Sequence, residues 1–275
     1  MSECNHDCSN CSANNCSDRK PDKSSFLKPM NKFSNIKNVI GIVSGKGGVG
    51  KSLVTCMLAN ECRKAGLKVG ILDADITGPS VPKSFGITQR AMQDENECLI
   101  PATTDGGIKI MSINLLLEDT QAPVVWRGPI ISNVVGQFWS DVNWGELDYL
   151  FVDMPPGTGD VALTVFQSLP INGIVIVSTP QDLVKMIVSK AYNMAKIMEV
   201  PVLGLVENMS YYVCEECGKK LNIFGKSQID ETASELGVPV LAKLPINPLL
   251  NQLIDKGEAE NIDCKELLPF VDALK

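Results

Sequence analysis

The chain has 275 residues, of which 44% are hydrophobic and 21% charged, with a net charge of −7 and a pI near 4.9. This size suits one large α/β domain with or without tails, and the acidic balance argues against a nucleic-acid-binding surface. No apolar run reaches the roughly 18 residues of a membrane span, and no signal-peptide pattern is present. We therefore expect a cytoplasmic protein that binds neither membrane nor nucleic acid.

Cysteine is abundant and histidine is nearly absent. The single histidine, His6, lies in a polar stretch, which argues against histidine-based triads and multi-histidine zinc sites. Ten cysteines in a reducing compartment point to metal or redox chemistry more than to disulfides. Six of them fall into two clusters, and we expect the other four to be ordinary buried thiols: Cys56, Cys62, Cys98 and Cys264.

Residues 1–35 are rich in Ser, Asn, Asp and Lys, which predicts a flexible tail ahead of a domain over residues 36–275. The tail carries four cysteines with the spacing C-x3-C-x2-C-x4-C, namely Cys4, Cys8, Cys11 and Cys16. Four thiolates this close can hold an iron–sulfur cluster, which is our preferred interpretation. A tetrahedral Zn²⁺ site and the absence of any metal are the alternatives. The first three cysteines also match the radical-SAM spacing, but that pattern belongs on a barrel loop, and a different motif follows here.

A glycine-rich stretch organises the chain and fits the P-loop pattern G-x-x-x-x-G-K-S/T. It consists of Gly45, Lys46, Gly47, Gly48, Val49, Gly50, Lys51 and Ser52. Residues 38–44 predict a buried strand, and residues 53–65 predict a helix that ends at Gly66. Backbone N–H groups and a helix N-terminus in this geometry cradle phosphates. Lys51 would lie between the β- and γ-phosphates of ATP and the Ser52 hydroxyl on Mg²⁺; the alternative is a glycine-rich turn without a ligand.

Lys46 is a second lysine, directly after the first glycine, where an ordinary P-loop needs no cation. It is either a solvated loop lysine or the mark of the deviant Walker A pattern K-G-G-x-G-K-S/T. The first lysine of that pattern reaches the nucleotide held by a partner subunit. This second interpretation predicts a homodimer with nucleotide at its interface, and it gives Lys46 a catalytic role beside Lys51.

Two aspartates follow the next predicted strand, residues 68–73. Asp73 and Asp75 come at the carboxyl edge of the sheet, where open α/β folds bind their ligands. An aspartate pair there can hold a magnesium-bound water or orient the attacking water. A helix N-cap or a turn is the alternative role. It suits Asp73 better than Asp75, which precedes a Gly-Pro turn, so we assign Asp75 to catalysis.

Residues 88–160 contain a second acidic motif, an aspartate at the end of an apolar strand. We expect an irregular excursion or hairpin over residues 88–107, a strand over 108–117 and a helix opened by residues 124–129 that runs to Trp139. Residues 147–153 form an apolar strand that ends in an aspartate, the Walker B arrangement, in which Asp153 binds Mg²⁺ through water. The loop of residues 154–160 combines prolines with glycine hinges and can sense the γ-phosphate.

The rest of the chain continues to alternate between strands and helices. We expect strands over 173–178, 202–207 and 238–244, and helices over 183–198 and 248–256. Asn208 ends the second of these strands and can present its amide to the nucleotide base; a turn residue is the alternative. The repeated rhythm predicts an α/β fold with a mostly parallel twisted sheet and helices on both faces, as in P-loop NTPases.

Cys214 and Cys217 form a C-x-x-C pair on a predicted loop, and no histidine follows His6 that could complete a metal site. One chain supplies two thiolates, whereas a four-iron cluster takes four. If Lys46 implies a two-fold dimer, an isologous contact brings the two pairs together around one cluster. Zinc binding and a redox dithiol are the alternatives. The dithiol is weakened because Gly218 follows where a thioredoxin-type motif opens a helix.

These motifs together resemble a known family, the Mrp/ApbC/Nbp iron–sulfur cluster carrier ATPases of the deviant Walker A class that includes MinD and ParA. The resemblance covers about residues 36–256 and is carried by GKGGVGKS (45–52), DADITGPS (73–80), WRGP (126–129), DYLFVDMPPGTGD (148–160), ENMSYYVCEECG (207–218) and LPIN (244–247). It implies an ATP-hydrolysing homodimer that holds a 4Fe-4S cluster at its interface and transfers it to apo iron–sulfur proteins. The four-cysteine tail resembles the Nbp branch, with a tighter spacing.

Two other functions stay open at this point. A spatial organiser in the manner of MinD or ParA would carry a C-terminal amphipathic helix or basic patches, whereas residues 265–275 are short and broken by Pro269. An electron-transfer ATPase like the nitrogenase iron protein would draw its cluster ligands from separate segments, whereas both cysteines here lie in one loop.

Overall fold

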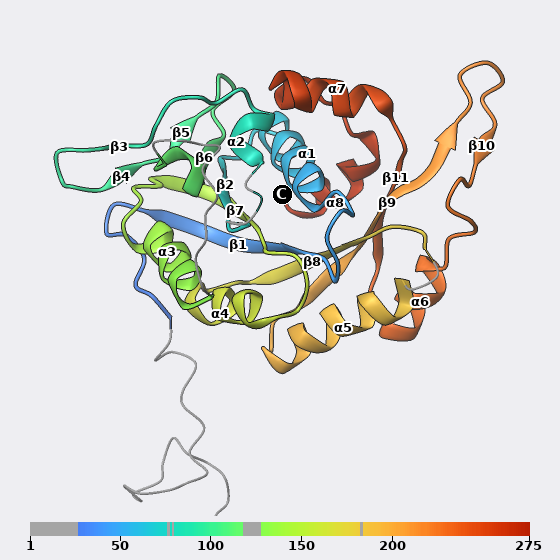
Figure 1. Cartoon of the computed structure of the whole chain (residues 1–275), viewed down its shortest axis with the longest axis horizontal. Helices are drawn as coiled ribbons and strands as arrows, with labels where there is room; N and C mark the ends of the chain where they lie inside the picture. The colour runs from blue at the N-terminus through green and yellow to red at the C-terminus, as the bar shows by residue number, and fades with distance from the viewer. Residues whose placement is uncertain (1–26, 76–77, 79, 118–127, 182–183) are drawn as a thin grey trace, which may run out of the picture.

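The structure is a computed structural model and describes residues 27–75, 78, 80–117, 128–181 and 184–275. Over these residues the predicted alternation of strands and helices is confirmed (Figure 1). The strands are β1 (Asn35–Val43), β2 (Val69–Asp73), β3 (Met92–Gln93), β4 (Leu99–Ile100), β5 (Ala102–Thr103), β6 (Lys109–Ser112), β7 (Glu146–Asp153), β8 (Gly173–Ser178), β9 (Val202–Val213), β10 (Lys220–Leu221) and β11 (Val240–Pro245). The α-helices are α1 (Lys51–Lys64), α2 (Val81–Ser84), α3 (Gly128–Ser140), α4 (Asp160–Ser168), α5 (Val184–Ile197), α6 (Ile229–Leu236), α7 (Pro248–Lys256) and α8 (Leu268–Ala273).

The described strands form a nine-stranded, mostly parallel sheet in the order β10-β9-β8-β1-β7-β2-β6-β5, with β11 also paired to β9. β1 lies in the middle, parallel to β7 on one side and to β8 on the other. β5 and β10 run antiparallel to their neighbours, and β3 pairs with β4 in the hairpin expected within residues 88–107. Because parallel strands end at one edge, the loops after β1, β2, β7 and β8 meet there.

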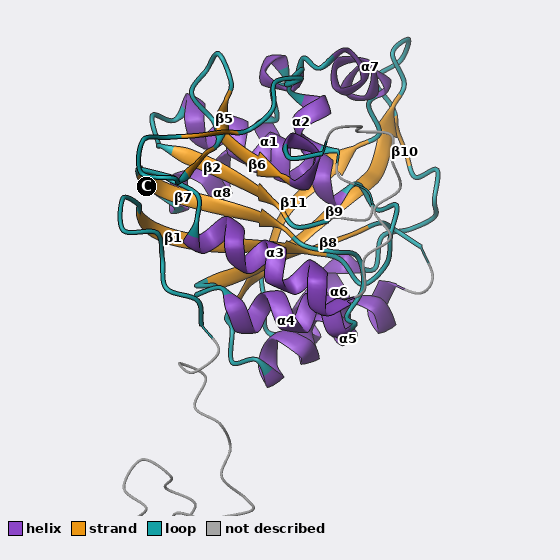
Figure 2. Cartoon of the chain, turned by 60° about the vertical axis from the view of Figure 1, so that its left-hand side comes forward, coloured by secondary structure: helices purple, strands orange, loops and turns teal. Residues whose placement is uncertain are grey.

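Helices cover both faces of the sheet, as its continuously apolar strands require (Figure 2). On one face, α3, α4, α5 and α6 pack against the sheet around Phe138, Trp144 and Leu150. On the other face, α1, α2, α7 and α8 pack around Met57 and Phe151. The central strands are therefore buried on both sides, which holds their ends in fixed positions for a ligand site.

The folded part of the chain begins ahead of the predicted boundary at residue 36. The Lys28 N–H donates to the Ser168 carbonyl at 3.0 Å, and the Trp139 indole N–H donates to the Lys28 carbonyl at 3.1 Å. The Ser34 hydroxyl donates to the Val142 carbonyl at 3.2 Å. These bonds fix residues 28–34 on α3 and α4. The division of the chain into a tail and a domain stays a prediction, since residues 1–26 lie outside the described part.

Two predicted strands differ from the structure, and two of its helices were not predicted. The strand expected over 108–117 ends at Ser112, because the Ser112 hydroxyl accepts the Asn114 N–H and caps a 3-10 turn over Ile113–Leu115. The strand expected to end at residue 207 continues to Val213, since β11 and β10 extend its pairing. The helices α4 and α6 were not expected, because elements of nine and eight residues give little periodic signal.

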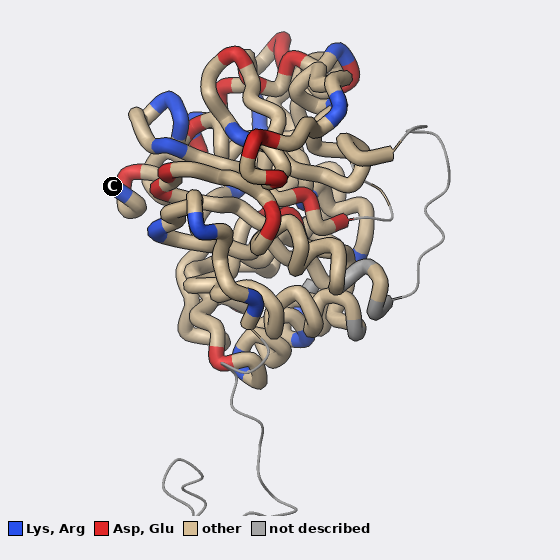
Figure 3. The backbone as a smooth tube through the Cα atoms, turned by 90° about the vertical axis from the view of Figure 1, so that its left-hand side faces the viewer, with Lys and Arg blue, Asp and Glu red and all other residues tan. Residues whose placement is uncertain are grey.

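The described surface carries charges of both signs. On the side of the molecule that Figure 3 presents, acidic and basic positions are interspersed along the backbone. Among the described helices, none is long and apolar enough to cross a membrane.

Candidate functional site

The P-loop follows β1 at the carboxyl edge of the sheet and leads directly into α1. Gly50 has φ of 80° and serves as the N-cap of α1, a conformation that favours glycine. A Cβ atom at Gly50 would lie 2.2 Å from the Asn208 Nδ2, and one at Gly45 would lie 2.3 Å from the Ile187 Cγ2. The loop is therefore wedged between β9 and α5, and its glycines are required by close approach as well as by backbone geometry.

The Asp153 carboxylate lies at the centre of the site. Its Oδ1 accepts from the Lys51 ammonium at 2.6 Å and from the Thr55 hydroxyl at 3.1 Å, and its Oδ2 accepts from the Ser52 hydroxyl at 2.6 Å. Asp153 is fully buried and Lys51 is 6% exposed. The predicted Walker A and Walker B residues are thus brought together, and Asp153 holds three side chains of α1 in position.

The two aspartates after β2 have different environments. The Asp75 carboxylate lies 3.7 Å from the Lys51 ammonium and keeps some exposure, so it faces the same cation as Asp153. Asp73 is fully buried and accepts from the Ser112 hydroxyl at 3.1 Å and from the Asp75 N–H at 3.2 Å. Burial, and then the charge of Asp153, raise the pKa of Asp73 to about 8. Asp73 therefore shapes the turn that presents Asp75.

Lys46 lies on the outer part of the P-loop, where its ammonium donates to the Gln181 side-chain carbonyl of the same chain. The loop of residues 154–160 crosses nearby: the Gly157 N–H donates to the Ser44 carbonyl at 2.9 Å, and Pro156 approaches Gly47. A conformational change in residues 154–160 would therefore displace the P-loop backbone. The role of Lys46 toward a partner subunit stays a prediction.

Asn208 lies inside β9 and not at its end, which corrects the sequence-based placement. Its amide Nδ2 donates to the Val49 carbonyl at 2.9 Å, and its Oδ1 accepts the Met209 N–H at 2.9 Å. The side chain is 3% exposed. Asn208 thus packs on the P-loop backbone beside Gly50, and a contact with the nucleotide base stays a prediction.

The cysteine pair lies apart from the P-loop, at the tip of a hairpin formed by β9 and β10 (Figure 1). Cys214 and Cys217 are free thiols, the first half-buried and the second exposed. Backbone N–H groups of Cys217 and Glu216 hydrogen-bond the Cys214 sulfur and lower the pKa of its thiol. A lowered pKa favours the thiolate, which is the form that ligates metals.

Within the described residues, no group of three or more His, Cys, Asp or Glu side chains could hold a metal ion. The hairpin therefore presents two cysteines per chain, and their binding of a metal stays a prediction. The four other cysteines of the described part are buried free thiols, as expected: Cys56, Cys62, Cys98 and Cys264. The tail ligands proposed from sequence, Cys4, Cys8, Cys11 and Cys16, lie outside the described residues, as do Trp126 and Arg127 of the WRGP motif.

Several residues of the site were not singled out from the sequence. Thr55 lies one helical turn after Lys51 on α1, so helical periodicity alone could have placed it at Asp153. Gln181 follows β8, and its proximity to Lys46 depends on β8 being the neighbour of β1. No local pattern gives that strand order.

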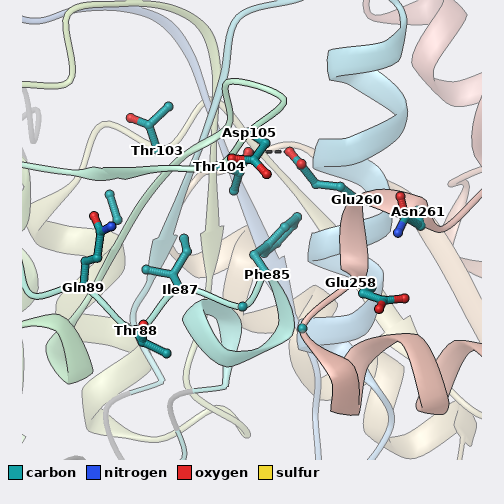
Figure 4. Close-up of a pocket in the computed structure, with 13 residues that line it drawn as sticks. Phe85, Ile87, Thr88, Gln89, Thr103, Thr104, Asp105, Glu258, Glu260 and Asn261 are labelled. Atoms are coloured by element: carbon teal, nitrogen blue, oxygen red, sulfur yellow. Dashed lines mark hydrogen bonds between the residues drawn. The ribbon is translucent and has the colours of Figure 1, made fainter.

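A cavity of about 350 Å³ lies away from the P-loop between three segments: residues 85–89, 102–105 and 257–261 (Figure 4). Asp105, Glu258 and Glu260 contribute carboxylates to its wall. The Glu260 carboxylate accepts from the Thr104 hydroxyl and from the Gly106 N–H, so it is used to join these segments. No residue assigned to a site from the sequence lines this cavity.

Comparisons with known proteins agree with this geometry. The family model described as ParA, NUBPL iron-transfer P-loop NTPase, matches residues 35–269. The chain is 53% identical over 235 residues to an iron-sulfur cluster carrier protein of Clostridium perfringens, covering 83% of this chain and 82% of that one. It is 44% identical over 279 residues to an iron-sulfur cluster carrier protein of Methanocaldococcus jannaschii, covering 100% and 96%.

Solved structures give the same picture. A nucleotide-binding protein from Archaeoglobus fulgidus in complex with ADP matches with a TM-score of 0.77 at 42% identity, over 86% of this chain and 92% of that one. The cell division protein MinD of Aquifex aeolicus matches with a TM-score of 0.59 at 20% identity, over 86% and 94%. The second likeness concerns the fold alone, and together they identify the sheet and helices as a MinD/ParA-like P-loop fold.

Proposed function

The chain belongs to the ParA family of NUBPL-type iron-transfer P-loop NTPases, and on this basis we propose that it carries an iron–sulfur cluster and delivers it to apoproteins under the control of ATP. The observation that carries the proposal is the pairing of a complete P-loop site with a C-x-x-C hairpin in which the pKa of the Cys214 thiol is lowered. The P-loop would bind the nucleotide, and the hairpin beyond the carboxyl end of β9 would hold a thiophilic cargo.

ATP would bind with its phosphates on the P-loop. Its β- and γ-phosphates compete with Asp153 and Asp75 for the Lys51 ammonium, which both carboxylates approach in this structure. Asp75 would then be released toward the attacking water, the role proposed for it from the sequence. Lys46 would reach the nucleotide of the partner subunit, after leaving the side chain of Gln181.

The residues at the P-loop also fit a magnesium ion. The Ser52 hydroxyl and the Asp153 carboxylate lie 2.6 Å apart, and oxygen atoms of these types are the ligands that Mg²⁺ takes in nucleotide sites. When bound, the ion would neutralise charge on the phosphate oxygens. Ser52 would bind it directly and Asp153 through water.

The cargo we propose is a 4Fe-4S cluster shared by two chains. Two thiolates per chain and a two-fold homodimer give the four thiolates that such a cluster takes. Cys4, Cys8, Cys11 and Cys16 would hold a further cluster in the tail. The buried free thiols elsewhere in the described part fit a reducing compartment such as the cytoplasm, where apo iron–sulfur proteins would be the acceptors.

The test is iron and sulfide per dimer after anaerobic reconstitution of the full-length protein. Four forms are compared: intact, Cys214→Ala, a form with the four tail cysteines changed to serine, and the combination. We expect Cys214→Ala to lose about four irons per dimer whether or not the tail cysteines are present, because two thiolates cannot hold the cluster. Cys264→Ala, a buried cysteine far from the hairpin in sequence, is the control and should keep its iron.

Delivery is measured as activation of an apo iron–sulfur enzyme, with and without ATP. Intact protein should activate it and Cys214→Ala should not. If the form without tail cysteines takes up zinc and no iron at Cys214 and Cys217, the hairpin is a zinc site and the proposed cargo is wrong.

A further inference from the structure

We propose that Glu207 is a positioning residue that joins the C-x-x-C hairpin to the P-loop, so that the bound nucleotide sets the exposure of Cys214 and Cys217. The inference rests on the proposed function in one respect, namely that these cysteines hold the cargo. It adds a structural route by which the P-loop controls the exposure of these cysteines. The hairpin is taken here as residues 211–226, from the first residue beyond Ser210 to the last before Ser227.

Glu207 is a fully buried carboxylate held by two hydroxyl groups. The Ser210 hydroxyl donates to its Oε2 at 2.5 Å, and the Ser227 hydroxyl donates to its Oε1 at 2.9 Å. Within the described residues no ion pair reaches Glu207, and Lys243, its neighbour in register on β11, pairs with Asp230 instead. A buried carboxylate depends on such bonds, because each unsatisfied oxygen would carry a full desolvation penalty.

The two serines stand at the two roots of the hairpin. Ser210 lies in β9 directly before the outgoing leg of the hairpin, and Ser227 directly follows the returning leg. One carboxylate therefore clamps both legs at the point where the hairpin leaves the domain. A shift of Glu207 must move both legs together, so it would reorient the hairpin as a unit.

The backbone beside Glu207 has the form of a joint. Between the register pairs Lys243–Glu207 and Pro245–Tyr211, β9 advances further than β11, so β9 bulges over residues 208–210. Met209, inside the bulge, has φ of 57°, a left-handed conformation that non-glycine residues rarely adopt. Strained residues of this kind persist only where their surroundings hold them, and they are concentrated at switch regions.

The other side of the joint touches the nucleotide loop. Asn208 follows Glu207 in the chain and donates to the Val49 carbonyl at 2.9 Å. Its Nδ2 fills the space that a Cβ atom at Gly50 would occupy. A change in the P-loop backbone on nucleotide binding must therefore displace the Asn208 side chain or carry it along. Asn208 and Glu207 are consecutive, so the movement reaches the clamp without any intervening flexible segment.

The experiment measures the rate at which iodoacetamide alkylates Cys214 and Cys217 in the reduced, cluster-free, full-length protein. Rates are read by peptide mass spectrometry, which separates these two thiols from all others. Samples contain no nucleotide, ADP or a non-hydrolysable ATP analogue, each with Mg²⁺. In the intact protein we expect the ATP analogue to change the rate by about fivefold or more, the lower end of typical coupling between sites.

The variants remove the clamp and leave the P-loop intact. In Ser227→Ala and in Glu207→Ala, the nucleotide effect on alkylation should fall to less than about twofold, while nucleotide affinity and ATP hydrolysis stay at the intact values. Ser227→Ala is the milder change and decides the matter if Glu207→Ala does not fold. Glu207→Gln should restore the effect, because its amide can accept from one serine and donate to the other. Ser168→Ala, a buried serine that bonds within α4, is the matched control and should behave as intact protein.

The inference is overturned if Ser227→Ala keeps the full nucleotide effect, or if nucleotide does not change alkylation of the intact protein. A loss of the effect in both variants with rescue by Glu207→Gln supports it. Because the assay needs no cluster, it stands apart from the test of the cargo. If nucleotide changes the alkylation rate in a protein that takes up no iron, the role of Glu207 is supported and the proposed cluster cargo is wrong.

Discussion

Asp153 organises the nucleotide site by the number of side chains it holds. Lys51, Ser52 and Thr55 all donate to its buried carboxylate, so the first turn of α1 is fixed from one point on β7. This fixed arrangement of side chains lowers the entropic cost of binding phosphate. A lysine already extended and paired loses less conformational freedom when a phosphate arrives, which leaves more of the interaction energy for affinity.

Replacing Lys51 by alanine should abolish ATP hydrolysis, because the phosphates would then face Asp153 and Asp75 without a cation. We expect the rate of phosphate release from Mg²⁺ and ATP to fall by about 100-fold or more. Lys37→Ala is the matched control. It removes an exposed lysine near the start of β1 that pairs with Asp148 of β7, and this variant should hydrolyse ATP at the intact rate. Near-normal hydrolysis by Lys51→Ala would contradict the P-loop assignment.

The residues that could be predicted from the sequence are those whose geometry is local. Lys51 and Ser52 follow from one loop and helix, and Asp153 follows from the end of one apolar strand. The contact of Gln181 with Lys46 requires the order of β8 and β1, and that of Asn208 with Val49 requires a bulge in β9. Both depend on pairing between distant segments, which no short pattern records.

The strands differ in how well their ends could be predicted from the sequence. β1 begins at Asn35, three residues before its predicted start, because its first residues are exposed or only partly buried. β2, β7 and β8 are mostly buried apolar runs, so both their existence and their limits were visible in the sequence. β9 was not, because its extension to Val213 depends on β10 and β11 as partners. Where a strand ends because of its partner strands, the residues of that strand alone do not predict the end.

The helices α6 and α7 offer a matched test of packing. Each ends at a glycine in the left-handed conformation, Gly237 with φ of 69° and Gly257 with φ of 77°. A Cβ atom at Gly237 would meet nothing within 4 Å, whereas one at Gly257 would lie 2.5 Å from the Gly86 Cα. Gly237→Ala should therefore cost about 1–2 kcal/mol of unfolding free energy, the penalty of the left-handed backbone alone.

For Gly257→Ala the same penalty applies, and the clash of α7 with Gly86 should add about 1–3 kcal/mol. Urea unfolding of both variants beside the intact protein measures the difference. Equal losses of stability would show that the approach of α7 to Gly86 is looser than the structure has it.

In the homodimer proposed above, Lys46 is the residue that should act between the two subunits. We predict that Lys46→Ala binds nucleotide in each subunit and hydrolyses it slowly, because the lysine acts on the partner's phosphates. Mixing this variant with Lys51→Ala creates dimers in which one site has its own Lys51 and receives Lys46 from the other chain. That site should regain hydrolysis, measured as phosphate release after subunit exchange.

Dimers of Lys46→Ala alone and Lys51→Ala alone are the controls, and exchange is verified with two affinity tags. Mixed dimers that stay inactive would assign Lys46 to its own subunit, where it contacts Gln181.

The C-x-x-C hairpin contributes no side chain to either core of the domain. Tyr211 and Tyr212 at its root are half-buried, whereas its other larger apolar residues are exposed: Val213, Leu221, Ile223 and Phe224. Substitutions there should alter the stability of the fold by no more than about 0.5 kcal/mol. The hairpin and the P-loop therefore face different evolutionary constraints. Single mutations in the hairpin can accumulate without unfolding the domain, whereas a side chain at Gly45 or Gly50 of the P-loop would clash with Ile187 or Asn208.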